Sequence, residues 1–398
     1  MNIIIVTGSP FPEGMAPTNR IISYGKGFIA NNAKVKVISL YPYKYSVNNK
    51  DLMISKGNFD NIKYERTVLF NEKNKLLKYK LLKFLQLYGL YKGLCIIIKE
   101  NKKEKIDTLI LHSNVLLYIF SFKFITKILK IKYIQEKSEF PFVLKKRTFL
   151  GKIYAKFYVN TVYKLFDGIL VESQRLYDFF ITKIKKNSKL LIVPPTIDPN
   201  SIVDEPINPF NDEYIFYCGS LSKDKKDGVD ILIYAFNKIL NKFPKIKLFI
   251  AGTGDLNYIN FLKDIINNLN INKNVQIIGE LKKNELIKYL KNAKILALAK
   301  ENDYLQSGGF SSKVIEYLYT GNPVVLTDLG ITTSYLKDKE TAFFAEPNNI
   351  DSFANVLIFV LENYDFAVKV GKSGQQFALK YFDYITHTKR IINFIDSL

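Results

Sequence analysis

Two glycine-bearing loops in the second half of the chain have the composition of anion-binding sites. The first begins at Gly219, directly after the apolar run 214–218, and contains three lysines, among them Lys225 and Lys226. Lysine binds phosphate as a point charge, so a loop of this kind between a strand and a helix could hold a diphosphate. Taken alone, the same run is better explained as a solvated surface loop.

The second loop reads GGFSS at 308–312 and opens a helical stretch. A serine at its end can cap that helix, which would place the preceding backbone amides at the positive end of the helix dipole. Glu316 lies about one turn into the helix and could contact the same ligand. A lone glutamate on a helix is usually solvated, but the double glycine and the cap favour a functional role here. The loop residues with this expected role are Gly308, Gly309, Phe310 and Ser311.

Two further glycine loops are weaker candidates. Gly254 belongs to the compact GTGD turn at 252–255, where the backbone could approach a ligand closely or simply turn. Gly14 lies in the loop 8–17 after the first apolar run, and the amides of a loop that opens a helix can bind an anion. A loop that merely turns fits both sequences as well.

The first half of the chain offers a histidine and several charged side chains beside strands. His112 ends the apolar run 108–112, and its neutral imidazole could hydrogen-bond a substrate hydroxyl or a developing charge. A half-buried structural histidine is an equally good interpretation. Glu136 and Glu139 follow another strand-like run, and with Arg20 they are candidates for positioning an acceptor. At least one of these acids is also compatible with a solvated loop.

The elements that must position these residues alternate between strands and helices in two series. Such alternation implies parallel βαβ units, with ligands bound beyond the carboxyl ends of the strands. The expected fold class is α/β, with two Rossmann-like domains facing each other across a cleft. The expected divisions are an N-terminal domain at 1–198, a linker rich in Pro, Asp and Asn at 199–213, a second domain at 214–375, and a C-terminal helix at 376–398 that packs back on the first domain.

The charge is strongly one-sided. The formal net charge is +21, and residues 1–200 contain 35 Lys and Arg against 14 Asp and Glu, whereas residues 201–398 contain 23 of each. This asymmetry suggests an anionic partner for the first domain, such as a lipid surface, a phosphorylated substrate or nucleic acid. Solubility through charge is the simpler alternative.

Composition excludes several classes of protein. Apolar residues make up 47% of the chain, which is ordinary for a globular protein and excludes a disordered one. Two cysteines are too few for a disulfide framework and favour a reducing compartment. In the N-terminal half the longest uncharged stretch, 108–122, falls short of the roughly 20 residues that span a bilayer. We therefore expect a cytoplasmic protein, peripheral at the inner face of the plasma membrane.

Five blocks of the sequence, in their order, resemble family 4 glycosyltransferases, which have the GT-B fold and retain anomeric configuration. The resemblance covers nearly the whole chain, and the order and spacing of the blocks are more specific than any one of them. The blocks are VPPTID, YCGSLSKDKKDGVDILIYAF, LFIAGTGD, VQIIGELKKNEL and GGFSSKVIEYLYTGNPVVLTDLG.

The resemblance implies that the second domain binds a nucleotide diphosphate sugar and the first domain binds the acceptor. Lys225 or Lys226 would hold the diphosphate, and Glu316 would bind the ribose hydroxyls. The loop ending at Leu281 would contact the base. His112, five positions after an aspartate as in the family's D-x4-H motif, would reach the reacting sugar.

The sequence also departs from the family pattern. Gly308 stands where the first glutamate of the family's E-x7-E motif is expected, and Glu301, Asp303 or Gln306 could substitute for it. Lys313 fits a subgroup whose motif reads more like GGFP-T-K-L-x-E-Y-L. A degenerate, non-catalytic copy is therefore an alternative.

The resulting hypothesis is transfer of a sugar to a hydroxyl of a glycan or lipid-linked acceptor in cell-surface polysaccharide or glycolipid synthesis. We expect no metal, no cofactor other than the donor, no nucleic acid, and contact with an anionic membrane. The alternatives are a non-catalytic GT-B partner in glycan assembly, a nucleotide-sugar epimerase, and a basic nucleic-acid-binding protein.

Overall fold

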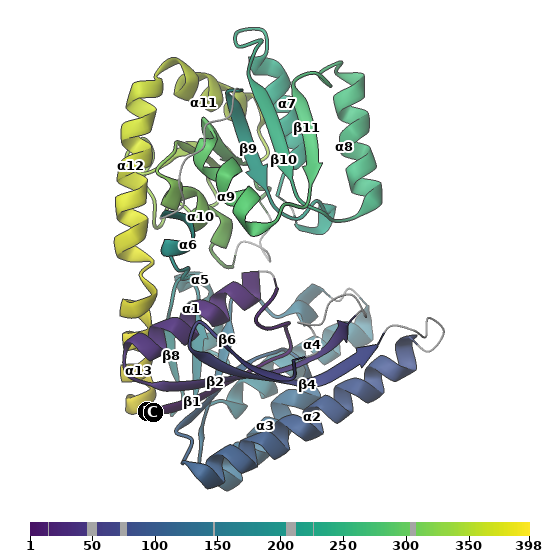
Figure 1. The fold of residues 1–398 in the computed structure, drawn as a ribbon, viewed down its shortest axis with the longest axis vertical. Coiled ribbons are helices and arrows are strands. Elements are labelled where there is room, and N and C mark those ends of the chain that lie inside the picture. Colours follow the sequence, from purple (N-terminus) through teal and green to yellow (C-terminus); the bar gives the residue numbers. More distant parts are fainter. Residues whose placement is uncertain are drawn as a thin grey trace. The chain divides into compact units, whose positions relative to one another are not determined.

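The computed structural model describes residues 1–14, 16–45, 54–71, 78–145, 148–203, 212–225, 227–302 and 308–398. The chain divides into two units (Figure 1). Residues 1–197 together with 384–398 form the first, and residues 198–383 form the second. Among the described residues, no helix combines the length and the apolar character needed to cross a bilayer.

The first unit is built on an eight-stranded sheet in the order β3-β4-β2-β1-β5-β6-β7-β8. All neighbouring strands are parallel except β3, which pairs antiparallel with β4. The central strands are apolar and buried on both faces, as parallel strands covered by helices must be. The strands are β1 (Asn2–Thr7), β2 (Lys34–Tyr45), β3 (Lys56–Phe59), β4 (Ile62–Asn71), β5 (Thr108–His112), β6 (Lys132–Lys137), β7 (Gly168–Val171) and β8 (Lys189–Ile192).

Helices connect these strands and cover the sheet (Figure 1). Helix α1 connects β1 to β2, whereas α2, α3, α4 and α5 make the connections that run in the opposite direction along the sheet. The helices are α1 (Ala16–Ala30), α2 (Lys78–Lys103), α3 (Leu116–Leu129), α4 (Phe149–Thr161), α5 (Gln174–Ile181) and α13 (Tyr384–Ser397), with 3₁₀ turns at Phe142–Lys145 and Val162–Leu165.

Helix α13 completes the core of the first unit by packing on α1. The approach is close at Gly27, where an added Cβ would lie 2.4 Å from Thr388 Oγ1 and 2.6 Å from the Tyr384 carbonyl oxygen. Ile391 and Ile395 of α13 join the same buried apolar cluster as the first strand. The last helix therefore belongs to the first unit although the whole second unit, 198–383, precedes it in the chain.

The second unit is a six-stranded, fully parallel sheet in the order β11-β10-β9-β12-β13-β14. Its strands are β9 (Tyr214–Cys218), β10 (Lys247–Ala251), β11 (Val275–Gly279), β12 (Ile295–Leu298), β13 (Val324–Thr327) and β14 (Phe343–Ala345). Its helices are α6 (Asn200–Val203), α7 (Val229–Ile239), α8 (Leu256–Asn268), α9 (Lys283–Asn292), α10 (Ser312–Thr320), α11 (Ile350–Glu362) and α12 (Tyr364–Tyr381), with a 3₁₀ turn at Lys223–Lys225. The expected α/β class with two parallel Rossmann-like sheets is confirmed.

The C-terminal helix expected at 376–398 is instead two helices, one in each unit. Helix α12 ends before Phe382, whose side chain is fully buried and packs against the rings of Phe310 and Tyr335. This aromatic contact lies entirely within the second unit. The helix is interrupted at Phe382 and Asp383, and α13 begins at Tyr384.

Candidate active site

Four charged or polar side chains converge at the carboxyl ends of neighbouring strands in the first sheet. Arg20, on α1, forms ion pairs with Glu136 (Nε to Oε1, 2.8 Å) and Glu172 (Nη1 to Oε1, 2.5 Å). The other carboxylate oxygen of Glu136 lies 3.0 Å from Nε2 of His112. Strands β5, β6 and β7 are adjacent and parallel, so residues that end them meet at one edge of the sheet.

Electrostatics fix the charge states in this network. Burial by itself would raise the pKa of Glu136, but the charges of Arg20 and His112 outweigh it and hold that pKa well below its usual range. Burial would also lower the pKa of Arg20, yet Tyr24, Glu172 and Glu136 together raise it. Glu136 is therefore an anion that can accept a hydrogen bond from Nε2–H of His112, which orients the imidazole ring.

A cavity of about 410 Å³ in the first unit lies over part of this network. His112, Glu136 and Glu139 all line it, so the structure brings together three of the side chains that the sequence singled out. Lys137 also lines it, and its ammonium group lies 2.5 Å from Oδ1 of Asn114. Burial lowers the pKa of Lys137 to about 8. The cavity thus combines an imidazole, carboxylates and an ammonium group.

Arg20 and Gly14 each make close contacts within the first unit. Arg20 does not line the cavity; its guanidinium is buried and also donates to the Val193 carbonyl oxygen, so it supports Glu136 instead of facing a ligand. At Gly14 an added Cβ would lie 2.1 Å from Oγ1 of Thr18, whose hydroxyl donates to the carbonyl of Pro10. The absence of a side chain at Gly14 thus leaves room for the Thr18 hydroxyl.

In the second unit, Lys313 and the end of β9 form a compact polar cluster. Lys313, on the first turn of α10, makes an ion pair with Asp227, which also accepts a 2.7 Å hydrogen bond from the hydroxyl of Tyr217. At Gly219 an added Cβ would lie 2.4 Å from Nζ of Lys313 and 2.5 Å from that same hydroxyl. The absence of a side chain at Gly219 thus leaves room for the ammonium group of Lys313 at the end of the strand.

The GTGD turn has a structural explanation. An added Cβ at Gly254 would lie 2.1 Å from the carbonyl oxygen of Leu221, and Leu221 exchanges backbone hydrogen bonds with Thr253 and Asp255. The loops that follow β9 and β10 are thereby held together. The close backbone approach that the sequence predicts at Gly254 is thus made to a neighbouring loop of the same unit.

Glu316 lies on α10 beside the Lys313 cluster. Burial raises its pKa to about 7, although Lys313 and Lys283 act in the opposite direction. In the described part of the chain, no hydrogen bond to its carboxylate is found. A carboxyl group with a raised pKa at the end of a sheet is a candidate for a functional site.

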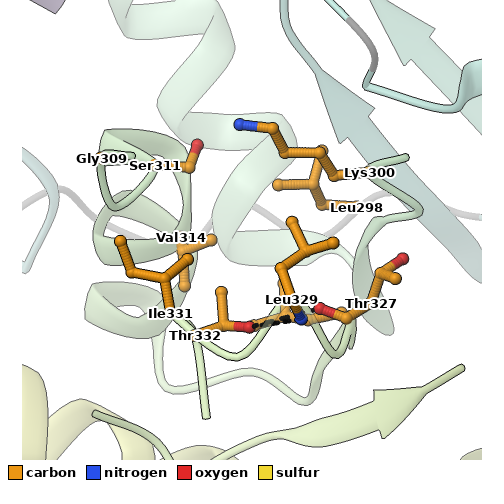
Figure 2. A pocket seen from close by; sticks show the side chains of 10 residues that line it. Leu298, Lys300, Gly309, Ser311, Val314, Thr327, Leu329, Ile331 and Thr332 are labelled. Atoms are coloured by element: carbon orange, nitrogen blue, oxygen red, sulfur yellow. Dashed lines mark hydrogen bonds between the residues drawn. The ribbon is translucent and has the colours of Figure 1, made fainter. Parts of the chain in front are cut away.

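Figure 2 shows the hollow at the N-terminal end of α10, lined by Gly309, Ser311 and Lys300 together with side chains of β12, β13 and the loop after β13. Ser311 occupies the N-cap position, but its side chain makes no capping hydrogen bond, contrary to one of the expected alternatives. Phe310 packs its ring against Tyr335 and is buried, so only its backbone could meet a ligand.

The remaining residues with an expected role in the donor site follow strands of the second unit in the sequence. Leu281 follows β11 and is half-buried. Lys226, Asp303 and Gln306 lie outside the described residues, and Lys225 is described only as the end of a 3₁₀ turn. Glu301 follows β12 and is half-buried.

Several residues of both sites give no clear signal in the sequence. Asp227 lies in the run KDKKDG and looks like a solvated acid, although it is the partner of Lys313. Lys137 ends β6 and Glu172 directly follows β7. A charged residue at the end of an apolar run is the signal by which the sequence could have suggested both. Their partners are distant in sequence, so only the order of the strands reveals the pairing.

Comparison with known proteins relates the chain to glycosyltransferases. Residues 201–377 match the family described as "Glycosyl transferases group 1". Two relatives from Methanocaldococcus jannaschii are uncharacterized glycosyltransferases: MJ1059 is 30% identical over 290 residues, covering 69% of this chain and 66% of the relative, and MJ1607 is 25% identical over 183 residues, covering 46% and 44%. The chain thus aligns with less than two thirds of each relative's length.

Solved structures of similar fold extend over the whole chain. Anabaena HepE in complex with UDP has a TM-score of 0.73 at 16% identity and covers 100% of both chains. A glycosyltransferase from Rickettsia africae ESF-5 has a TM-score of 0.72 at 16% identity, covering 99% of this chain and 97% of that one. Sucrose-phosphate synthase from Thermosynechococcus elongatus has a TM-score of 0.73 at 14% identity, covering 100% and 98%. The chain therefore has the GT-B fold, and its second unit carries a glycosyl transferases group 1 domain.

Proposed function

We propose that this protein is a glycosyltransferase that moves a sugar from a nucleotide diphosphate sugar to a hydroxyl of a glycan or lipid-linked acceptor, with retention of configuration. The observation that carries the proposal is the group 1 domain at 201–377, in which Lys313, Glu316 and the α10 N-terminus lie at one end of the sheet. The proposed reaction needs no cofactor beyond the donor.

The donor site is proposed at the carboxyl ends of β9 and β12. Glu316 would accept hydrogen bonds from the ribose hydroxyls, and Lys225 or Lys226 would hold the diphosphate. The amides at Gly309 and Phe310 would meet the donor at the positive end of α10. Anabaena HepE, which shares the fold, was crystallised in complex with UDP, and this makes UDP the first nucleotide to try.

The acceptor site is proposed in the cavity of the first unit. His112 would hydrogen-bond the reacting sugar or its developing charge, held in place by Glu136. Glu139 would contact the acceptor. The leaving phosphate of the donor would help to remove the proton from the acceptor hydroxyl, so that this proton ends on the released nucleotide diphosphate.

The donor proposal is tested by thermal stabilisation with UDP, ADP, GDP and their glucose derivatives. A ligand at about 100 times its Kd adds about 2.7 kcal/mol to the free energy of unfolding. We expect one base to stabilise the wild type and to lose this effect in Glu316→Ala and in Lys225→Ala/Lys226→Ala. Lys245→Ala/Lys263→Ala removes two exposed lysines of the same unit and should respond like the wild type. Absence of stabilisation by every nucleotide would contradict the donor proposal.

A non-catalytic partner is the second candidate, favoured by Gly308 at the position of the first motif glutamate. Nucleotide binding without sugar release to any acceptor or to water would support it. Steady hydrolysis of one nucleotide sugar, abolished by His112→Ala, would favour the enzyme instead.

We also propose that the protein acts in the cytoplasm at the inner face of the plasma membrane. The excess of positive charge in residues 1–200 supports this location.

A further inference from the structure

Three helices of the first unit expose apolar stripes that the fold does not cover. On α2 the side chains of Phe84 and Tyr91 are 65% and 64% exposed, and on α3 Phe124 is 69% exposed. On α4, Phe149 and Leu150 are 78% and 76% exposed. At 100° per residue the exposed apolar residues of each helix fall within an arc of about 100°. We call the set the apolar face: Phe84, Leu87, Tyr88, Tyr91, Leu117, Phe120, Phe124, Ile128, Phe149, Leu150, Ile153 and Phe157.

The connections that contain the three helices run over the same side of their sheet, and α4 packs on the two 3₁₀ turns that flank it, the second of which contacts α3. Each connection joins parallel strands in the same direction along the sheet order, from β4 to β5, from β5 to β6 and from β6 to β7. Right-handed crossovers that run in one direction place their helices on one face, and α1, which runs in the other direction, lies on the opposite face. Helices α2 and α3 are in direct contact and lie side by side (Figure 1).

The apolar face is edged by positive charge alone on two of the three helices. Exposed lysines flank the stripes at 83 and 92 on α2, 127 on α3, and 152 and 156 on α4. The sequences of α3 and α4 contain no Asp or Glu, and that of α2 contains only Glu100, near its end. Apolar side chains that insert between headgroups, flanked by lysines, match an anionic lipid surface.

The stripes also reach the cavity that holds His112. Gln86, between two apolar-face residues of α2, lines the cavity, as do Val115 and Tyr118 at the start of α3. Val115 is itself 49% exposed. A molecule whose apolar part lies along the face could therefore place its polar head in the cavity.

We propose that the apolar face lies on an anionic membrane leaflet and that the acceptor is a membrane lipid whose polar head enters the His112 cavity. The choice of acceptor rests on the proposed function, whereas the membrane contact does not. A second copy of the chain is the less suitable occupant, because a two-fold interface would place the same lysines against each other without acids to pair them.

The first test is flotation with vesicles of phosphatidylcholine alone and of equal parts phosphatidylcholine and phosphatidylglycerol. We expect binding to the mixed vesicles only. Leu150→Ser should weaken it about fivefold and Phe149→Ser/Leu150→Ser by more than about twentyfold, because each apolar side chain adds to insertion. Leu256→Ser is the matched control, since Leu256 is 74% exposed on the first turn of a helix in the second unit. Equal losses from Leu150→Ser and Leu256→Ser, or no vesicle binding by the wild type, would overturn the proposal.

Cys95 provides a second test on the unmodified protein. It is exposed on the α2 stripe, four residues after Tyr91, whereas Cys218 is buried. Mixed vesicles should slow maleimide labelling of Cys95 severalfold. Unchanged labelling of vesicle-bound protein would place the contact elsewhere and overturn the proposal. A dimer in light scattering that Leu150→Ser dissociates would assign the face to a second copy and would equally overturn it.

The acceptor part has its own readout. When extracted membrane lipid is supplied in mixed vesicles, the protein should transfer the sugar of a labelled nucleotide sugar to a lipid-soluble product. Phe149→Ser/Leu150→Ser should reduce the formation of this product more than it reduces hydrolysis of the donor. Transfer only to water-soluble glycans, with vesicle binding intact, would overturn the lipid acceptor. If no nucleotide stabilises the protein while it still binds vesicles, the proposed function is contradicted and the membrane contact is supported.

Discussion

At the scale of single residues, Arg20 illustrates how a buried charge is tolerated. Its guanidinium lies between Glu136 and Glu172, and the side chains of the pair with Glu136 are only 6% and 2% exposed. A buried ion pair is costly to desolvate, and the cost is offset only while all partners are present. The network therefore fixes Glu136, which in turn holds His112.

We expect Arg20→Met to lower the free energy of unfolding by roughly 3 kcal/mol or more, because two carboxylates lose their counter-charge inside the fold. Urea denaturation followed by circular dichroism measures this change. Lys34→Ala is the control: it removes the exposed ion pair with Glu104, and the expected loss is below about 1 kcal/mol. Similar losses in the two variants would show that the Arg20 network does not stabilise the fold.

Glu316 gives the second residue-scale prediction, a dependence on pH. Its pKa in the fold, about 7, is higher than that of an unfolded glutamate, so the folded state binds an extra proton between the two values. The free energy of unfolding should then fall as pH rises from about 5 to about 8, and less so in Glu316→Gln. Melting temperatures of both proteins without ligand, over that range, test this.

The donor proposal adds an opposite trend for ligand binding. If the carboxylate of Glu316 accepts hydrogen bonds from ribose, affinity for UDP-glucose should rise as pH increases through about 7 and stay flat in Glu316→Gln. Titration calorimetry gives the affinities. A parallel pH dependence in wild type and variant would separate Glu316 from the nucleotide.

At the scale of elements, the end of β9 and the start of α10 are fitted to each other. Because Gly219 has no side chain, Nζ of Lys313 fits beside it and forms its ion pair with Asp227. We expect Gly219→Ala to displace Lys313, and both Gly219→Ala and Lys313→Ala to weaken UDP-glucose binding about tenfold. The double variant should be no weaker than either single one, since both changes remove the same interaction. Additive losses in titration calorimetry would mean that Gly219 acts independently of Lys313.

At the scale of the whole molecule, the two units differ in how they are built from the chain. The second unit is one continuous segment, 198–383, whereas the first needs the distant segment 384–398. Ile391, Phe394 and Ile395 of that segment belong to the apolar core of the first unit. Removing them would expose that core to water.

We therefore expect a fragment of residues 198–383 to unfold cooperatively and to keep its stabilisation by the nucleotide that stabilises the whole chain. A fragment of residues 1–197 should lack a cooperative transition, and a tethered 384–398 segment should restore it. Calorimetry of the three fragments tests this. Cooperative unfolding of 1–197 alone would show that α13 is dispensable.

Much of the fold could be predicted because apolar strands and their following loops are local patterns. The apolar runs at 108–112 and 214–218 are strands with the expected bounds, and the first apolar run is β1. The hairpin of β3 and β4 is not evident in the sequence, since charged residues such as Lys63 and Glu65 interrupt its apolar pattern. Helix α2 is equally hard to predict, because its apolar residues do not follow one clean face.

Sequence alone predicts the α/β class, the resemblance to GT-B glycosyltransferases, and the candidate residues His112, Glu136, Lys313 and Glu316. The tertiary structure adds that Arg20 supports Glu136, that Asp227 pairs with Lys313, and that α2, α3 and α4 each expose an apolar stripe. The physical reason is that spacing along the chain encodes local structure. Contacts between distant residues depend instead on the order of strands in the sheet and on the faces that their crossovers cover.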